Sequence, residues 1–266
     1  MTDQRGTERD RQTQWQIKTA KPVFPAYRFA ETRANVAPMI LRAFLVLILV
    51  AGCGRRLSES EMAFATVIHG EQLNQNRVRL VRGAPLGSVT FRRKARPRVS
   101  CRELILPPPR DEVVTVTPAA ITLFNKVLFT KNWYTEDYLP AFPDRLYLIE
   151  AMLLTHELTH VWQWQNRART GYHPLRAAAE HSASDDPYLF DLADAPDFLD
   201  YGFEQQGAIV EEYVCCRALA PDAARTKRLH SMLKGAFPVS DLPRDGKREW
   251  DVYLPWKEAD LSGICT

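Results

Sequence analysis

The sequence lacks an apolar run of the roughly 20 residues that a membrane-spanning helix needs, since its longest one lies within residues 39–53. Its net charge of +3 is too small to indicate nucleic-acid binding. Its 5 cysteines do not have the paired spacing of a structural zinc site. The remaining features are those of an ordinary globular protein: 266 residues, of which 45% are hydrophobic and 25% charged. This length suits one medium-sized domain with flanking segments.

A His-Glu-x-x-His motif occupies residues 156–160, in a segment that we expect to be helical. Residues four apart share one face of a helix, so His156 and His160 can both reach one metal ion. Glu157 directly follows His156 on this helix and can act as a general base on the water that the metal activates. Two imidazoles, a third ligand from elsewhere and an open position for water form the arrangement of zinc peptidases. The alternative is a pair of ordinary helix histidines, one buried and one exposed.

The helix that carries this motif is predicted over residues 144–167. Phe142-Pro143-Asp144 is typical of a helix start, because proline and an acidic residue favour the N-terminal end. An apolar stripe continues from there into the motif and consists of Leu146, Ile149, Leu153 and Leu154. A helix of this length can form the core of the domain.

Residues 39–53 have the pattern of an export signal: one arginine, an apolar run, then small residues before Cys53. Residues 50–53, Val-Ala-Gly-Cys, resemble the lipobox of bacterial lipoproteins, in which the cysteine is lipidated and becomes the mature N-terminus. We therefore expect translation from Met39, with residues 1–38 untranslated or disordered, and a signal peptide over residues 39–52. Residues 53–266 would form a zincin-like metallopeptidase domain facing the periplasm, and Gly54 would permit sorting to the outer membrane. The alternative is a buried, uncleaved hydrophobic helix.

Four further cysteines are compatible with export: Cys101, Cys215, Cys216 and Cys265. An even number in an oxidising compartment permits two disulfides. Because Cys215 and Cys216 are adjacent and point in different directions on a helix, each needs its own partner. Cys101 and Cys265 are the candidates, and the pairing between them stays open. The alternative is that some of these are free buried thiols.

The expected elements indicate an α+β fold, a minimal zincin-like domain with a small sheet and two metal-bearing helices. Ser58 and Glu61 form a capping-box pattern for a helix that Gly70 ends, and His69 is expected at its surface. Strands are predicted at residues 77–82, 89–91, 103–106, 113–116, 121–124 and 126–129. Further helices are predicted at residues 174–181, from residue 201 onwards, and at residues 222–234. In zinc peptidases an edge strand shortly before the metal helix pairs with an extended peptide substrate.

The third metal ligand is expected downstream of the motif, where the candidates are His173, Glu180, His181, Glu204, Glu211 and Glu212. The metzincin extension is absent, since residue 163 is Gln and residue 166 is Asn. A glutamate on a following helix is the gluzincin arrangement. Glu204 stands 44 positions after His160 on the second predicted helix, and Glu211 shares its face seven residues later. From spacing alone, the choice between Glu204 and Glu211 stays open.

Two segments of the chain resemble a small group of bacterial proteins called Vgr-related. They are His156-Glu157-Leu158-Thr159-His160-Val161-Trp162-Gln163 and Tyr201-Gly202-Phe203-Glu204-Gln205-Gln206-Gly207-Ala208-Ile209-Val210. The resemblance covers roughly residues 57–215 and implies a gluzincin-like domain with Glu204 as the third ligand. Gly207 stands where that group usually has alanine, and a lipoprotein signal is not a feature of the group.

The function we expect is peptide-bond hydrolysis by a water that Zn²⁺ activates, with His156, His160 and Glu204 as ligands and Glu157 as the base. Its partners would be a peptide or protein substrate and, through a lipid on Cys53, the membrane of the cell envelope. A residue that stabilises the oxyanion remains open among His173, His181, Tyr201 and Tyr213.

Three alternatives compete with this expectation. The first is a non-catalytic zinc-fold lipoprotein that binds or scaffolds at the envelope or a secretion apparatus. The second is a partner of membranes or nucleic acid acting through residues 77–102, which hold nine basic residues; the small net charge argues against nucleic acid. The third is a cell-wall amidase acting on peptidoglycan stem peptides.

Overall fold

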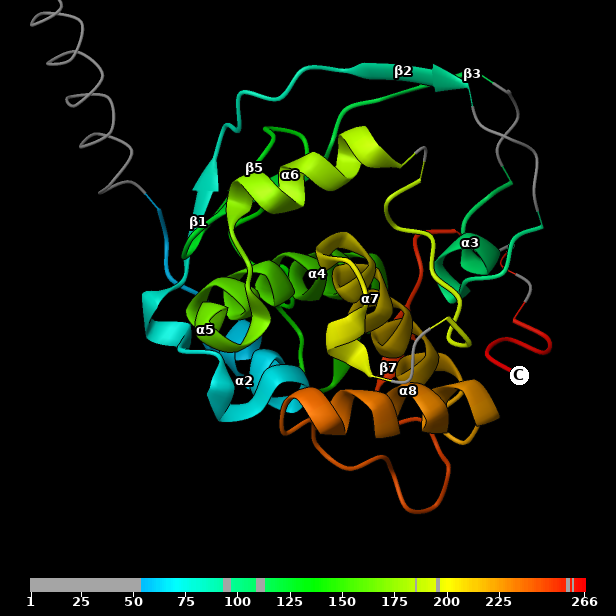
Figure 1. The fold of residues 1–266 in the computed structure, drawn as a ribbon. Coiled ribbons are helices and arrows are strands. Elements are labelled where there is room, and N and C mark those ends of the chain that lie inside the picture. The colour runs from blue at the N-terminus through cyan, green and yellow to red at the C-terminus, as the bar shows by residue number, and fades with distance from the viewer. Residues whose placement is uncertain are drawn as a thin grey trace, which may run out of the picture. The chain divides into compact units, whose positions relative to one another are not determined.

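The structure is a computed structural model and describes residues 54–92, 97–108, 113–184, 186–194, 197–256, 259 and 261–266. Its helices are α2 (Glu59–His69), α3 (Cys101–Ile105), α4 (Leu148–Gln165), α5 (Arg167–Thr170), α6 (Pro174–Ala183), α7 (Phe203–Leu219) and α8 (Ala224–Ala236). Its strands are β1 (Arg79–Arg82), β2 (Val89–Arg92), β3 (Val113–Val116), β4 (Ala120–Leu123), β5 (Lys126–Phe129), β6 (Arg145–Tyr147) and β7 (Asp251–Tyr253). The expected α+β class is confirmed (Figure 1).

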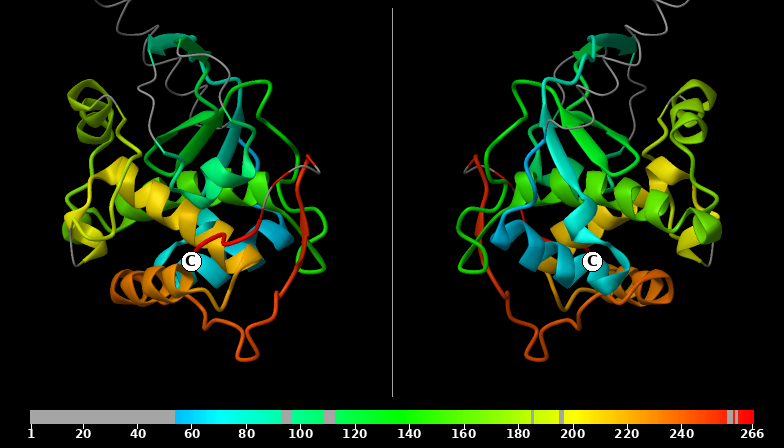
Figure 2. Two further views of the ribbon diagram at one scale, coloured as in Figure 1. Left: turned by 90° about the vertical axis from the view of Figure 1, so that its right-hand side faces the viewer. Right: turned by 90° about the vertical axis from the view of Figure 1, so that its left-hand side faces the viewer.

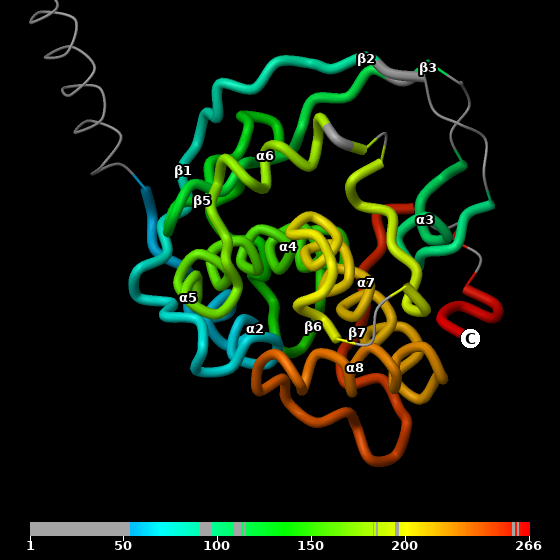
Figure 3. The backbone as a smooth tube through the Cα atoms, in the orientation of Figure 1, coloured from blue at the N-terminus to red at the C-terminus, as the bar shows by residue number. Residues whose placement is uncertain are grey.

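The strands in the described ranges form three small sheets. In the largest, β5 lies between β1 and β4, parallel to β1 and antiparallel to β4. β4 is therefore an edge strand, with a partner on one side only among the described residues. β2 and β3 form an antiparallel ribbon that projects away from the helices (Figure 2). The third sheet joins β6, just before α4, to β7 near the C-terminus (Figure 3).

The core of the domain forms where α4 packs against α7. Both helices are buried along most of their length, so neither shows the one-sided pattern of a surface helix. Leu158 and Trp162 of α4, and Ile209 and Tyr213 of α7, are completely buried. Each such side chain stabilises the fold by about 1.5 to 3 kcal/mol through removal of apolar surface from water. The His-Glu-x-x-His motif therefore lies on a helix that is buried along most of its length.

The expected start of α2 is confirmed in detail. The Ser58 hydroxyl accepts from the Glu61 backbone N–H at 3.2 Å, and the Glu61 carboxylate accepts from the Ser58 backbone N–H at 2.8 Å. Gly70 follows the helix with φ of 56°, a conformation that costs glycine little. Glu61 also binds Arg55 through two hydrogen bonds of 2.7 Å, which fixes the segment that enters the domain.

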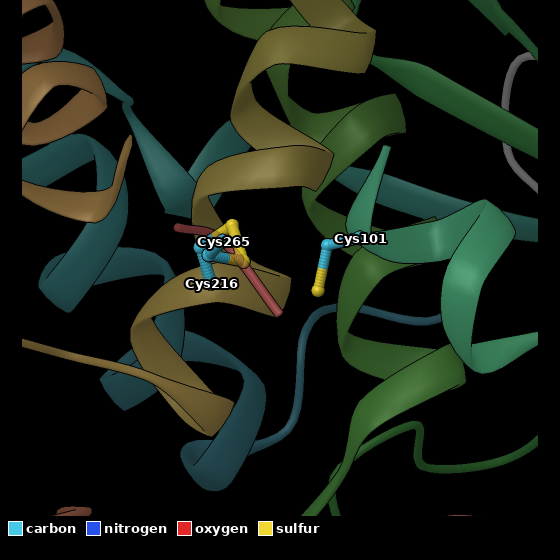
Figure 4. A group of neighbouring side chains, drawn as sticks. All are labelled: Cys101, Cys216 and Cys265. Carbon is cyan, nitrogen blue, oxygen red and sulfur yellow. A yellow bond between two sulfur atoms is a disulfide. The ribbon is translucent and has the colours of Figure 1, made fainter. Parts of the chain in front are cut away.

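Two disulfides connect distant segments to α7. Cys101 at the start of α3 bonds to Cys215, and Cys216 bonds to Cys265 near the C-terminus. Figure 4 shows Cys101, Cys216 and Cys265 close together beside α7. The expectation that the adjacent cysteines take separate partners is confirmed, and the alternative of free thiols is wrong.

Three expectations about the elements are wrong. α4 begins at Leu148, not at residue 144, because residues 145–147 form β6 and pair with residues 251–253. Residues 103–106 are not a strand, since Ser100 and Glu103 form a capping box that starts the short helix α3. His69 is fully buried instead of lying at the surface, because α2 packs against α4 and Phe237.

The expected signal peptide over residues 39–52, the lipid-bearing Cys53 and residues 1–38 lie outside the described residues. Within the described part of the chain, every helix is too short or too polar to cross a membrane.

Candidate metal centre

The structure brings His156, His160 and Glu204 together between α4 and α7. The Nε2 atoms of His156 and His160 are 3.3 Å apart, and each is 3.4 Å from Glu204 Oε2. All three side chains are buried. The two histidines are neighbours because they are one turn apart on α4, and Glu204 meets them because the first turn of α7 packs on that face.

These three atoms have the spacing that a tetrahedral ion requires. Zinc binds imidazole nitrogen and carboxylate oxygen at about 2.0 to 2.1 Å, which in a tetrahedron places ligand atoms about 3.3 to 3.4 Å apart. The observed triangle has sides of 3.3, 3.4 and 3.4 Å. Two imidazoles and a carboxylate are also a ligand set that suits zinc. The residues present therefore fit a zinc ion with its fourth position open.

The electrostatics of the cluster favour a cation between the three ligand atoms. Burial favours the neutral imidazole, but contacts with Glu204 and Glu211 raise the pKa of His156 to about 10. Burial likewise opposes ionisation of Glu204, yet His160, His156 and His181 hold the pKa of its carboxyl far below the usual range. The carboxylates thus stabilise positive charge at this point, and a divalent metal would supply that charge in place of protons.

A hydrogen-bond chain fixes the tautomer of His160. Its Nδ1–H donates to Gln163 Oε1 at 2.8 Å, which leaves the Nε2 lone pair for a metal. The Gln163 amide is itself oriented, because its NH₂ group donates to the Phe203 carbonyl at 3.1 Å and to Gln206 Oε1 at 2.9 Å. Gln206 donates in turn to the Tyr201 carbonyl at 2.7 Å. Gln163 therefore couples the orientation of His160 to the first turn of α7.

Glu211, seven residues after Glu204 on α7, supports His156 from the other side. Its Oε2 is 3.4 Å from His156 Nδ1, an ion-pair contact that does not have the geometry of a hydrogen bond, and its Oε1 is 3.1 Å from Arg102. Burial opposes its ionisation, but Arg102 and His156 lower the pKa of Glu211. A carboxylate behind a metal-binding imidazole orients the ring and increases its basicity. Glu211 therefore holds a supporting position and does not belong to the ligand triangle.

The Glu157 carboxylate faces the edge strand β4 and lies near enough to His156 and His160 for its charge to act on both. The Thr122 hydroxyl donates to Glu157 Oε2 at 2.7 Å, and the carboxylate is buried. This hydrogen bond orients the carboxylate, and no hydrogen bond from a described residue reaches its Oε1. An oriented carboxylate beside an open metal position is the arrangement that a general base requires.

Helix α6 holds the start of α7 in place with two consecutive residues. The Glu180 carboxylate accepts from the backbone N–H groups of Phe203 and Glu204, both at 2.9 Å. A negative charge there also complements the helix dipole. His181 Nε2 lies 3.2 Å from Glu204 Oε1, so the two carboxylate oxygens face different partners. The position of Glu204 is thus fixed through both its backbone and its side chain.

The other candidates for the third ligand and the oxyanion donor lie elsewhere. His173 Nδ1 accepts from the Leu175 N–H at the start of α6. Glu212 accepts from the Cys101 backbone N–H and pairs with Arg225. The Tyr201 hydroxyl donates to the Asp191 carbonyl, and the Tyr213 hydroxyl contacts His230 and Arg217. Only His181 among the expected oxyanion donors lies at the site.

Several residues of the site were not anticipated from the sequence. The ring of Tyr172 stacks on His160 with centroids 5.9 Å apart, and Tyr188 lies 5.8 Å from the ring of His156. Thr122 and Arg102 were also missed. Thr122 faces inward between the exposed Ile121 and Leu123, the reverse of what the alternation of apolar and polar residues predicts for this strand, so the local sequence did not reveal it. Arg102 carries no local signal either, because its contact spans 109 residues.

No protein-family model matches the chain. Over 219 residues, which are 79% of the chain, it is 26% identical to the type VI secretion system spike protein VgrG2b of Pseudomonas aeruginosa. The chain spans 18% of the length of that protein. Among solved structures, the effector domain of Pseudomonas aeruginosa VgrG2b is similar with 23% identity and a TM-score of 0.44, covering 77% of this chain and 97% of that one. The expected similarity to Vgr-related proteins is thus found at the level of sequence, with a spike protein of this secretion system.

Proposed function

We propose that this protein is a zinc-dependent hydrolase that cleaves peptide bonds. The observation that carries the proposal is the triangle of His156 Nε2, His160 Nε2 and Glu204 Oε2, with sides of 3.3 to 3.4 Å, beside the oriented carboxylate of Glu157. A purely structural zinc site is closed by four protein ligands, whereas this cluster offers three among the described residues, which would leave a position for water.

His156, His160 and Glu204 would hold the ion, which supplies a Lewis acid and lowers the pKa of water to about 7. Glu157 would accept the proton from the attacking water on Oε1 and then pass it to the leaving amine. Thr122 keeps the carboxylate in one orientation through both transfers. His181 and Tyr188, at the open side of the site, are the residues available to stabilise negative charge on the carbonyl oxygen.

The edge strand β4 favours an extended peptide as the substrate. One edge of β4 pairs with β5, and Thr122 in its middle contacts the proposed base. An extended peptide that adds to the free edge would make main-chain hydrogen bonds and pass directly beside Glu157. The competing function is that of a zinc-containing binding or scaffold protein without enzymatic activity. Such a role does not require a base, so it does not explain the buried carboxylate of Glu157.

We further propose a role associated with type VI secretion, supported by the similarity to the VgrG2b spike protein. A lipid anchor on Cys53 and a location facing the periplasm remain separate proposals that rest on the lipobox-like residues 50–53. Incorporation of labelled palmitate into the protein, and its loss in Cys53→Ser, would support the anchor. Unlabelled parent protein in a lipoprotein-producing host would contradict it.

The proposed hydrolysis is tested with Glu157→Gln, Glu204→Ala and Glu211→Ala. The purified parent protein is expected to bind about one zinc per chain by its three ligands and to cleave unfolded polypeptides. Glu157→Gln should keep the zinc and lose activity by about 10²- to 10⁴-fold, because only the base is removed. Glu204→Ala should lose both zinc and activity. Glu211→Ala should keep the ligand triangle and weaken zinc binding about tenfold.

Glu136→Gln, the same chemical change at an exposed position, is the matched control and should behave as the parent. Zinc content is measured by elemental analysis and activity by the release of new amino termini. A parent that binds zinc while Glu157→Gln remains fully active would refute the catalytic mechanism. Loss of zinc in Glu211→Ala alone would show that the third ligand is Glu211.

A further inference from the structure

Phe124 occupies a conformation that is unusual for an aromatic residue. It lies in the two-residue turn between β4 and β5 with φ of 60°, and its side chain is 48% exposed. The left-handed region costs a non-glycine residue about 1 kcal/mol or more, which is why Gly and Asn predominate in such turns. An exposed phenylalanine is therefore unfavourable here both for the backbone and for solvation.

The surrounding contacts hold this turn against both α4 and β1. The Gln165 side chain donates to Asn125 Oδ1 at 2.9 Å, and the Arg79 backbone N–H donates to the Asn125 carbonyl at 2.9 Å. The Phe124 ring lies 4.6 Å from the half-buried Trp164 ring. The Arg167 guanidinium covers Trp164 at 4.4 Å from its centroid. Phe124 and Trp164 thus form a fixed, partly exposed aromatic surface.

The strand β4 and the turn that follows it contact α4 at two successive points, first at Glu157 and then at this aromatic surface. Glu157 and Trp164 are seven residues apart and share a face of α4. Thr122 contacts the first of them and Phe124 the second. Seven residues advance a helix by roughly 10 Å, which equals about three residues of an extended strand. The aromatic surface is therefore about three substrate residues away from the proposed base.

We infer that Phe124 and Trp164 form a specificity subsite that binds an apolar or aromatic side chain of the peptide, two or three residues from the bond that is cleaved. The inference rests on the proposed peptidase function and deepens it by naming a substrate feature. Strain that is held in place beside a reactive site is typical of binding determinants. The alternative is that Phe124 only packs on Trp164 and stabilises the fold. Removal of Phe124 changes substrate preference in the first case and stability in the second.

The experiment uses the full chain with zinc, as parent, Phe124→Gly and Trp133→Ala. The substrates are peptides of one length in which a single Phe is moved along an otherwise Ala- and Gly-based sequence. The parent should prefer Phe at one position two or three residues from the cleaved bond. In Phe124→Gly this preference, the ratio of kcat/KM for the Phe-containing peptide to that for the all-Ala peptide, should fall about tenfold. The thermal midpoint of Phe124→Gly should equal or exceed that of the parent, because glycine tolerates the turn.

Trp133→Ala removes an equally exposed aromatic residue, 44% accessible, outside this subsite and should leave the preference unchanged. Cleavage by Phe124→Gly with the parent's preference would overturn the inference and leave the peptidase proposal intact. A lower thermal midpoint with unchanged preference would assign Phe124 to packing. A zinc-loaded parent that cleaves none of the peptides would refute the peptidase proposal, and this inference with it.

Discussion

His69 shows at the scale of one residue how burial sets a pH limit on the fold. Its Nε2–H donates to the Thr159 hydroxyl at 3.0 Å, and this hydroxyl donates to the Thr155 carbonyl at 2.8 Å. Its Nδ1 is buried without a hydrogen-bond partner. Burial lowers the pKa of His69 to about 3. Between that value and the unfolded pKa of about 6.5, the unfolded chain binds more protons, so stability must fall as the pH falls.

His69→Gln keeps a donor for Thr159 and removes the titration. The free energy of unfolding is measured in urea at pH 6.5 and at pH 5. Between these values it should fall more steeply in the parent than in the variant, by up to about 1.4 kcal/mol per pH unit. Above pH 7, where His69 is neutral in both the folded and the unfolded state, the free energy of unfolding should change with pH almost equally in the two proteins. Equal slopes between pH 6.5 and 5 would show that His69 does not limit acid stability.

Individual residues also show what the sequence could predict. Helix periodicity was enough to place His156 and His160 on one face, and the resemblance to Vgr-related proteins selected Glu204 from six candidates. The burial of His69 was not predictable, because it depends on how α2 packs against α4. Arg102 could not be assigned to the site either, since Glu211, which it contacts, lies 109 residues later. Residues fixed by local spacing were found, and those fixed by tertiary contacts were not.

At the scale of elements, the site depends on how closely α7 approaches α4. A Cβ atom on Gly207 would lie 2.7 Å from Cε1 and 2.9 Å from Nε2 of His156. Real Cβ atoms do not approach another heavy atom so closely, so any side chain at this position must displace the ring. Glycine at position 207 is therefore required for the present position of His156, although the resemblance led us to note alanine as the usual residue.

Gly207→Ala is expected to move the His156 ring and to lower zinc affinity about tenfold or more, as changes that reorient a ligand do. The matched control is Gly235→Ala in α8, where a Cβ atom meets nothing within 4 Å. The control should keep its zinc affinity and gain roughly 0.5 to 1 kcal/mol from better helix propensity. Zinc affinity is measured by competition with a chelator. An unchanged zinc affinity in Gly207→Ala would mean that α4 and α7 can move apart to accommodate the methyl group without weakening the site.

The elements themselves were predicted unevenly for a physical reason. Helices with their own capping and apolar signals were found, as α2 and α6 show. Residues 145–147 were misread as the first turn of α4, because their strand exists only through pairing with residues 251–253. The misassigned α3 did carry a local signal, the capping box of Ser100 and Glu103, which its β-prone residues concealed.

At the scale of the whole molecule, the two disulfides join α7, which carries Glu204 of the candidate metal centre, to segments distant in the sequence. The Cys101–Cys215 bond joins the start of α3 to α7, with a sequence separation of 114 residues. The next residue, Arg102, contacts Glu211, which contacts His156. The Cys216–Cys265 bond, with a separation of 49 residues, joins α7 to the C-terminal segment, which contacts none of the three ligand residues in the described structure. The two bonds share a helix but differ in their relation to the site.

Loop-closure entropy predicts that each bond stabilises the fold by similar amounts, about 4 to 5 kcal/mol. The double variants Cys101→Ser/Cys215→Ser and Cys216→Ser/Cys265→Ser should therefore lose similar stability. Only the first should also lose zinc affinity, by about tenfold, because Arg102 no longer holds Glu211 behind His156. Affinities are compared by chelator competition at a temperature where both variants remain folded. An equal loss in both would mean that general loosening of α7 weakens the site. Unchanged affinity in the first would mean that Glu211 orients His156 without Arg102.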